Sequence, residues 1–254
     1  MVFNVLYEDN HLLAVDKPAG LLVQGDRSGD PTLVEAAGAY LKEKYAKPGN
    51  VYVGLVHRLD RNTSGVVLLA RTSKAASRLS ARFRDDEVTK VYLAVVAGRP
   101  DPAEGELVSY LAGKGDRQGV TRASATPFSG ARESRLRYNV RESAAGLSLV
   151  EVRPVTGRRH QIRAQFALAG HPLVGDVKYG SRERLSGHRI ALHAYKLAVA
   201  HPIRNEEGER PMVFEAATPP DWPWPPGFPG TSGLFSWSNA TPVSARRPAA
   251  ATAK

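Results

Sequence analysis

The chain has 254 residues, 42% of them hydrophobic and 24% charged, which is typical of a soluble globular protein with one large domain. It contains no cysteine, so a disulfide framework and a cysteine-bound metal are both excluded. The first residues carry no secretory signal, and no apolar run is long enough to span a bilayer, so we expect a cytoplasmic protein without a membrane partner. Lys and Arg number 35 against 25 Asp and Glu, a surplus that suggests either a polyanionic partner or simply a basic surface.

The first part of the chain predicts a hairpin followed by strands and helices in alternation. Short apolar runs separated by turn residues indicate strands, and apolar residues at helical spacing behind Thr32 or Asp30 indicate a helix. The expected strands are 5–7, 12–16, 51–56 and 65–70, and the expected helices are 33–41 and 73–83, the second capped by Thr72 or Ser73.

The rest of the chain predicts further strands at 91–96, within 106–150 around a polar loop at 113–130, and at 190–199. A helix is expected over 158–169, ended by Gly170. Hairpins with few helices indicate an α+β fold with a largely antiparallel sheet. We expect a catalytic domain over residues 1–218 and a Pro-rich, disordered tail over 219–254.

A dense polar segment, His57–Gly65, lies between two of the expected strands. Its carboxylate, Asp60, stands beside Arg58 and Arg61, whose charges favour the ionised form that can act as a nucleophile or base. Thr63 can hold the loop through side-chain hydrogen bonds. Taken alone, the segment is more typical of a turn that Asp60 caps while the arginines face solvent.

A second cluster, Arg153–Arg163, is rich in basic side chains. Arg159 and Arg163 are four residues apart, so on a helix they share a face with His160. A basic face at a helix start suits a phosphate group or a salt bridge to a carboxylate, whereas the alternative is a solvated basic helix. Further upstream, Lys90 and Tyr92 point to the same side of a strand, where Tyr92 could stack on a base or serve as an ordinary strand aromatic.

Together these segments resemble the RluA-type family of RNA pseudouridine synthases. The similarity runs through residues 8–20, 57–65, 90–98 and 156–163, continues in Gly175-Asp176, Tyr179-Gly180 and 192–194, and covers about residues 3–217. The His-Arg-Leu-Asp-x-x-Thr-Ser-Gly and Gly-Arg-x-His-Gln-Ile-Arg segments are highly specific. One departure is Arg159, which stands where the family usually has threonine.

The resemblance implies a central, mostly antiparallel sheet with flanking helices and a cleft between two lobes. It implies that Asp60 is the essential carboxylate, that Tyr92 stacks on the target base with a further role in proton transfer at C5, and that Arg163 pairs with Asp60. Arg58 would fill the gap left by a flipped nucleotide. We expect further substrate contacts from the same two segments, by His57, Arg61, Thr63, Arg158 and His160.

The implied activity is an isomerase that converts uridine in ribosomal RNA, transfer RNA or both to pseudouridine. Asp60 would attack covalently or remove a sugar proton to give a glycal, and the sequence leaves both routes open. No cofactor or metal is expected, since the histidines show no ligand spacing. We expect a monomer whose catalytic domain selects the RNA, because the similarity begins near residue 3 and leaves no room for the RNA-binding domain that often precedes it.

Two other classes of function fit parts of the sequence. A non-catalytic RNA-binding protein on the same fold would show the same charge pattern, although it has no need of Asp60, Tyr92 and Arg163 together. A hydrolase with Asp60 as nucleophile needs a second carboxylate nearby, where this sequence supplies arginines. A serine hydrolase built on Ser64 lacks the Gly-x-Ser-x-Gly pattern.

Overall fold

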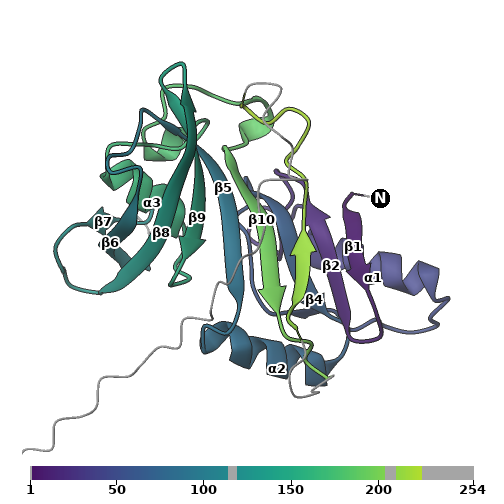
Figure 1. Ribbon diagram of the computed structural model, residues 1–254. Coiled ribbons are helices and arrows are strands. Elements are labelled where there is room, and N and C mark those ends of the chain that lie inside the picture. The colour runs from purple at the N-terminus through teal and green to yellow at the C-terminus, as the bar shows by residue number, and fades with distance from the viewer. Residues whose placement is uncertain (1, 114–118, 204–209, 225–254) are drawn as a thin grey trace, which may run out of the picture.

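The computed structural model describes residues 2–113, 119–203 and 210–224. Within them, eleven strands form one sheet and three α-helices lie against it (Figure 1). The helices are α1 (Leu33–Lys44), α2 (Ser73–Arg84) and α3 (Gln161–Leu168), with short 3-10 helices η1 (Val177–Tyr179) and η2 (Ser186–His188). The strands are β1 (Asn4–Glu8), β2 (Leu12–Lys17), β3 (Gly54–Leu55), β4 (Ser64–Ala70), β5 (Thr89–Ala97), β6 (Glu104–Ala112), β7 (Ala123–Ser124), β8 (Ala131–Ala144), β9 (Leu147–Pro154), β10 (Leu192–Val199) and β11 (Met212–Glu215).

The strand order is β1-β2-β4-β10-β5-β9-β8-β6-β7, with β3 added to β4 and β11 to β10. The pairing of β4 with β10 is parallel, and the other pairings are antiparallel. The predicted α+β fold with a mostly antiparallel central sheet is therefore confirmed. The parallel pair joins an amino-terminal half, β1 to β4 with α1 and α2, to a second half, β5 to β9 with α3 (Figure 1).

The amino-terminal half buries both faces of its sheet. Along β2, Leu13 packs with α1, whereas the neighbouring Leu12 and Ala14 pack with α2. This follows from strand geometry, because successive side chains point to opposite faces. Both helices begin at threonine caps: the hydroxyl of Thr32 accepts from the backbone of Glu35, and α2 has the same arrangement at Thr72.

The second half packs α3 on one face of β5, β8 and β9. Ile162 and Phe166 on α3 lie in the same apolar cluster as Ala94 and Val96 of β5. The opposite face of β5 packs with Trp224, which is buried. Residues 219–224, the start of the expected Pro-rich tail, thus include a side chain that belongs to the core, and residues 225–254 lie outside the described residues.

At the junction of the two halves there is no space for a side chain at position 65, the second residue of β4. Gly65 has a φ of 111°, and an added Cβ would clash with the Ala194 carbonyl. Beside it, the buried Ser64 hydroxyl lies 2.8 Å from Nδ1 of His193, whose Nε2 is 2.9 Å from the Ala216 carbonyl oxygen. The segment that carries Asp60 therefore enters β4 in a fixed position relative to β10.

Two predicted elements are shorter than expected. Of the strand predicted over 51–56, only Gly54–Leu55 pairs with β4. The helix predicted over 158–169 begins at Gln161, because His160 adopts a left-handed conformation with a φ of 53°. The prediction that Arg159 shares a helix face with Arg163 was therefore wrong.

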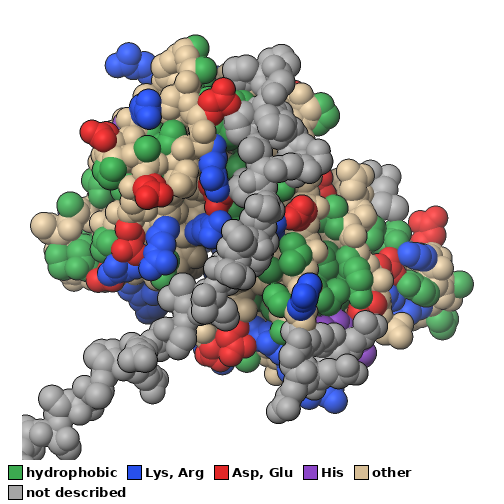
Figure 2. Space-filling model, viewed as in Figure 1, with side chains coloured by type: hydrophobic (Ala, Val, Ile, Leu, Met, Phe, Trp, Pro, Cys, Tyr) green, Lys and Arg blue, Asp and Glu red, His purple; other side chains and the backbone are tan. Residues whose placement is uncertain are grey.

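The surface in Figure 2 carries Lys and Arg side chains interspersed with Asp and Glu side chains over both halves. The positive surplus is thus not gathered into one patch on this face. In the part of the chain that the structure describes, no helix is long and apolar enough to cross a membrane.

Candidate active site

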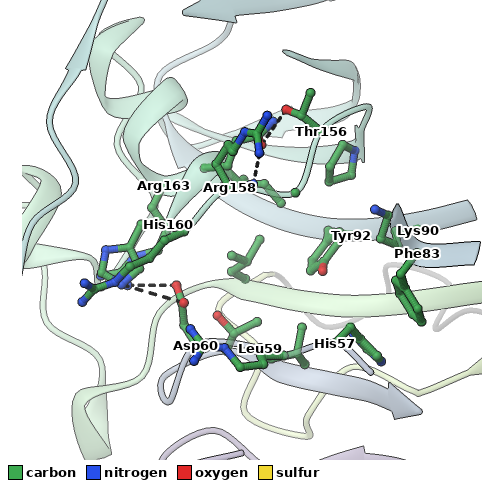
Figure 3. A pocket seen from close by; sticks show the side chains of 18 of the residues that line it. His57, Leu59, Asp60, Phe83, Lys90, Tyr92, Thr156, Arg158, His160 and Arg163 are labelled. Carbon is green, nitrogen blue, oxygen red and sulfur yellow. Dashed lines mark hydrogen bonds and ion pairs between the residues drawn. The ribbon is translucent and has the colours of Figure 1, made fainter. Parts of the chain in front are cut away.

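A pocket of about 540 Å³ lies between the two halves, where the expected cleft should be. Three segments supply most of its lining: the loop before β4, the end of α2 with the start of β5, and the loop that leads into α3 with the first turn of that helix. Leu192 of β10 completes it. Figure 3 shows Asp60, His160 and Arg163 at one end, Tyr92 in the middle, and His57, Phe83 and Lys90 at the other end. The pocket thus collects residues from the distant sequence clusters.

Asp60 is held by Arg163, a residue 103 positions away. Nη1 of Arg163 donates to Oδ2 of Asp60 over 3.1 Å. The same guanidinium makes a two-pronged contact with Asp176, with Nε to Oδ2 at 2.6 Å and Nη2 to Oδ1 at 2.8 Å. The Arg163 and Asp176 side chains are 5% and 1% exposed, whereas that of Asp60 is 26% exposed. A buried arginine therefore bridges a buried carboxylate and one that reaches the pocket.

His160 faces the second oxygen of the Asp60 carboxylate. Its Nε2 is 3.8 Å from Oδ1 of Asp60, and its Nδ1 is 2.9 Å from the hydroxyl of Tyr179. Burial lowers the pKa of His160 to about 4, against the attraction of the Asp60 charge. The imidazole is therefore neutral near pH 7, and its contact with Asp60 is not an ion pair.

The loop that carries Asp60 is anchored by a buried lysine. Nζ of Lys17 donates to the carbonyl oxygens of Pro18, Leu21 and Arg61 at 2.8, 2.9 and 3.2 Å. Burial lowers the pKa of Lys17 to about 7, against the attraction of the Asp60 and Asp16 charges. The lysine thus ties the turn after β2 to the residue that follows Asp60.

Arg61 and Thr63 contribute to the same loop in different ways. Arg61 does not line the pocket: its Nε donates to the carbonyl oxygen of Gly20, and its Nη1 pairs with Asp30 at 2.7 Å. Thr63 does line the pocket, and its backbone N–H donates to the Asp60 carbonyl oxygen over 3.1 Å. The Thr63 hydroxyl is buried and has no hydrogen-bond partner among the described residues.

His57 stabilises the start of the loop that connects β3 to β4. Its Nε2 accepts the backbone N–H of Leu68 over 2.9 Å, and its ring stacks on Phe83 with centroids 4.6 Å apart. Burial lowers the pKa of His57 to about 3, with a smaller contribution from the Lys90 charge. The ring is neutral, and since Nε2 is an acceptor the proton lies on Nδ1.

Tyr92 lies in the middle of the pocket wall, two residues after Lys90 on β5, and both side chains line the pocket as strand alternation predicts. Burial raises the pKa of the Tyr92 phenol, with a further contribution from the Asp60 charge. Burial lowers the pKa of Lys90. Tyr92 is therefore a protonated phenol over the whole neutral range.

The loop before α3 is fixed by Gln161 and carries the remaining basic residues. Oε1 of Gln161 accepts from the Thr156 hydroxyl and from the backbone N–H of Arg158, at 2.8 and 3.0 Å. The Arg158 side chain is left exposed at the pocket. Arg159, the departure from the family pattern, donates to the carbonyl oxygen of Gly119 over 3.3 Å.

Of the nine predicted site residues, eight line the pocket and Arg61 does not. Three further residues support the site without a predicted role: Lys17, Asp176 and Tyr179. All three lie in segments of the family resemblance, which was the available signal, but their contacts depend on the fold. Among residues 2–113, 119–203 and 210–224, no group of three or more His, Asp or Glu side chains could hold a metal ion.

Comparison with known proteins agrees with the geometry. The family model described as RNA pseudouridylate synthase matches residues 11–168. The chain belongs to this family. Ribosomal large subunit pseudouridine synthase C of Vibrio cholerae is 34% identical over 218 residues, which cover 84% of this chain and 66% of that protein. Ribosomal large subunit pseudouridine synthase D of Zymomonas mobilis is 35% identical over 229 residues, 85% of this chain and 69% of that one.

The fold is also shared with a solved structure of this family. A human protein, RNA pseudouridylate synthase domain containing 4, superposes with a TM-score of 0.70 at 23% identity, over 85% of this chain and 89% of that one. The chain spans about two thirds of the length of the bacterial relatives. The residues that the family model matches, 11–168, include the lining residues of the pocket other than Leu192.

Proposed function

We propose that the protein is an RNA pseudouridine synthase that isomerises uridine in large-subunit ribosomal RNA, with Asp60 as its catalytic carboxylate. In this reaction the bond between N1 and C1′ breaks, the uracil turns, C5 bonds to C1′, C5 loses a proton and N1 gains one. The observation that carries the proposal is the partly exposed Asp60, held by Arg163 at one end of a basic pocket.

Arg163 orients the carboxylate, and Asp176 orients Arg163. The two-pronged contact with Asp176 fixes the plane of the guanidinium, so that Nη1 presents one donor to Asp60. Asp60 is placed either to attack C1′ or to remove a sugar proton, and both routes require the same held carboxylate.

Tyr92 is suited to stack on the flipped uracil in the middle of the pocket. Its raised pKa means that the phenol stays protonated, so it offers a hydrogen bond rather than a basic oxygen near pH 7. Flipping a base costs a few kcal/mol. Stacking on Tyr92 and insertion of Arg58 into the stack would offset that cost.

The basic side chains of the pocket are available to RNA phosphates. Arg58, Arg84, Lys90 and Arg158 line the pocket, and their side chains form no ion pair within the described parts of the chain. Unpaired cations of this kind supply the sequence-independent part of RNA affinity, which weakens with salt. His57 and Thr63, which also line the pocket, are further candidate substrate-binding residues.

The choice of ribosomal RNA rests on the relatives, which are named as large-subunit synthases. Transfer RNA is the alternative substrate. The proposal includes the monomeric state and the cytoplasmic location expected from the sequence. Light scattering during size-exclusion chromatography tests the monomeric state.

The test is to incubate purified protein, and separately the Asp60→Ala variant, with unmodified total RNA and to map pseudouridine by carbodiimide adducts that stop primer extension. New stops in large-subunit RNA with the wild-type protein alone are the expected result. Stops in transfer RNA would change the substrate and leave the activity standing. No new stops on RNA that the protein binds, or on intact ribosomal subunits, would favour the non-catalytic RNA-binding protein.

A further inference from the structure

A short turn, residues 176–180, supports both side chains that flank Asp60. Asp176 accepts two hydrogen bonds from the Arg163 guanidinium. The same guanidinium lies over the ring of Tyr179, with 4.9 Å between Cζ of Arg163 and the ring centroid. The Tyr179 hydroxyl lies 2.9 Å from Nδ1 of His160. The backbone N–H of Tyr179 donates to the Asp176 carbonyl oxygen, so the two supports form one unit.

The Tyr179 hydroxyl has partners on two segments, Thr121 and His160. The backbone N–H of Thr121 donates to the Tyr179 oxygen over 2.8 Å. With that donor in place, the phenol proton can be donated to Nδ1 of His160, in competition with the Thr121 hydroxyl. A neutral imidazole that accepts at Nδ1 carries its proton on Nε2. Nε2 of His160 is the nitrogen that faces Asp60, whose negative charge favours a proton there.

The two oxygens of the Asp60 carboxylate are therefore in different surroundings. Oδ2 accepts from Arg163, whereas Oδ1 lies 3.8 Å from Nε2 of His160, which is too long for a hydrogen bond. Both Oδ1 and the imidazole N–H are left to interact with a bound nucleotide. The left-handed backbone of His160, unusual for a residue other than glycine, holds the ring in this position.

We propose that Tyr179 is a positioning residue that fixes His160 as its Nε2–H tautomer, so that His160 donates a hydrogen bond to an oxygen of the target uridine beside Oδ1 of Asp60. The inference rests on the proposed function, since it names the substrate contact of the same site. It adds a role for Tyr179 and makes Oδ1 the reacting oxygen of Asp60.

Tyr179→Phe tests the role of the hydroxyl, because phenylalanine keeps the ring under Arg163 and removes only the oxygen. Single-turnover pseudouridine formation should slow by about tenfold, the upper range for one net hydrogen bond, while RNA affinity stays within about twofold. Tyr138→Phe is the matched control, since it removes a hydroxyl that donates to Pro102 outside the pocket. An unchanged rate in Tyr179→Phe would overturn the proposal.

A double-variant cycle distinguishes a positioning role from an independent one. If Tyr179 acts through His160, the Tyr179→Phe change should have no further effect in a His160→Gln background. Effects that multiply in the double variant would mean that Tyr179 acts by another route and would contradict the proposal.

The tautomer itself is measured without substrate. Long-range ¹H–¹⁵N spectra of histidine-labelled protein, with His160 assigned by its loss in His160→Gln, should show the proton on Nε2 in the wild type and a mixture in Tyr179→Phe. A proton on Nδ1 in the wild type would overturn the inference. An inactive wild-type enzyme with the expected tautomer would instead count against the proposed function alone.

Discussion

At the scale of single residues, the site is organised around one guanidinium shared by two carboxylates. Arg163 is buried, and both Asp60 and Asp176 accept from it. Loss of one partner from such a buried set is costly, because the remaining charge has no partner. The arrangement therefore keeps Asp60 fixed while leaving part of its carboxylate open to the pocket.

Arg163→Lys tests whether the geometry of the guanidinium matters in addition to its charge. Lysine cannot contact Asp60 and the two oxygens of Asp176 from one planar group. We expect the rate of pseudouridine formation to fall by about 100-fold, roughly 2.7 kcal/mol in the activation free energy. Single-turnover assays with saturating enzyme measure it, and a lysine variant at full rate would show that charge alone suffices.

The residues at the site were predictable to different degrees. The pairing of Arg163 with Asp60 followed from the family resemblance, and the structure places the two groups 3.1 Å apart. The roles of Asp176 and Tyr179 were not predictable, because their partners are set by how the turn after α3 folds back. Arg61 was predicted as a substrate contact because it is a basic residue next to Asp60. In the structure its guanidinium instead donates to the Gly20 carbonyl oxygen and pairs with Asp30.

At the scale of elements, the loop before β4 depends on the turn after β2. Lys17 is fully buried and donates to three carbonyl oxygens, one of them on Arg61 next to Asp60. A buried polar group is tolerated when its hydrogen bonds are made, and its loss leaves the partner carbonyls unsatisfied. Lys17 thus links the hairpin of the amino-terminal half to the loop that carries Asp60.

Lys17→Met should lower stability by about 2–3 kcal/mol and slow the reaction, because three buried carbonyls lose their donor. Denaturant unfolding followed by circular dichroism measures the first effect, and single-turnover rates below the unfolding range measure the second. Lys42→Gln on the exposed side of α1 is the matched control. A methionine variant with unchanged stability and rate would contradict the anchoring role.

The α2–β5 edge of the pocket predicts a separate effect on RNA binding. Arg84 and Lys90 lie there without an ion-pair partner among the residues described. Each phosphate contact adds about one to the slope of log affinity against log salt, so Arg84→Gln and Lys90→Met should each reduce that slope by about 1. Filter binding across a salt series measures it, with Lys42→Gln again as control. Unchanged slopes would place the RNA backbone elsewhere.

The elements were predicted best where apolar residues recur regularly along the whole element. The helices after Thr32 and Thr72 and the strands of the first hairpin agree with the sequence pattern. The helix that carries Arg163 was predicted to start three residues too early, since Gln161 hydrogen-bonds the preceding loop and His160 turns the backbone out of the helical range. Helical spacing alone does not reveal such a side-chain contact.

At the scale of the whole molecule, one buried and two partly buried histidines make stability depend on pH. Burial lowers the pKa of His57, His160 and His193 to about 3, 4 and 4, whereas the ordinary value is 6.5. Below about pH 6.5 the unfolded chain takes up protons that the folded protein does not. The stabilisation is therefore fully present above pH 6.5 and declines as the pH falls toward 4.

The melting temperature should accordingly fall when the pH is lowered from 7 to 4.5. Near pH 5.2, unfolding should take up nearly one proton at each of these histidines. The free energy of unfolding should therefore change by about 1.4 kcal/mol per pH unit for each of them. Urea unfolding at a series of pH values measures the slope. A free energy of unfolding that stays constant over this range would show that the histidines are not buried in their neutral form.

The central claim is that Asp60, held by Arg163, is the catalytic carboxylate, and an isosteric substitution tests it most directly. Asp60→Asn keeps the shape of the side chain and one acceptor for Arg163 but removes the charge. Single-turnover pseudouridine formation on the mapped RNA should become undetectable, while the Kd for that RNA stays within about threefold of wild type. An asparagine variant that turns over at a rate near that of the wild type would contradict the account.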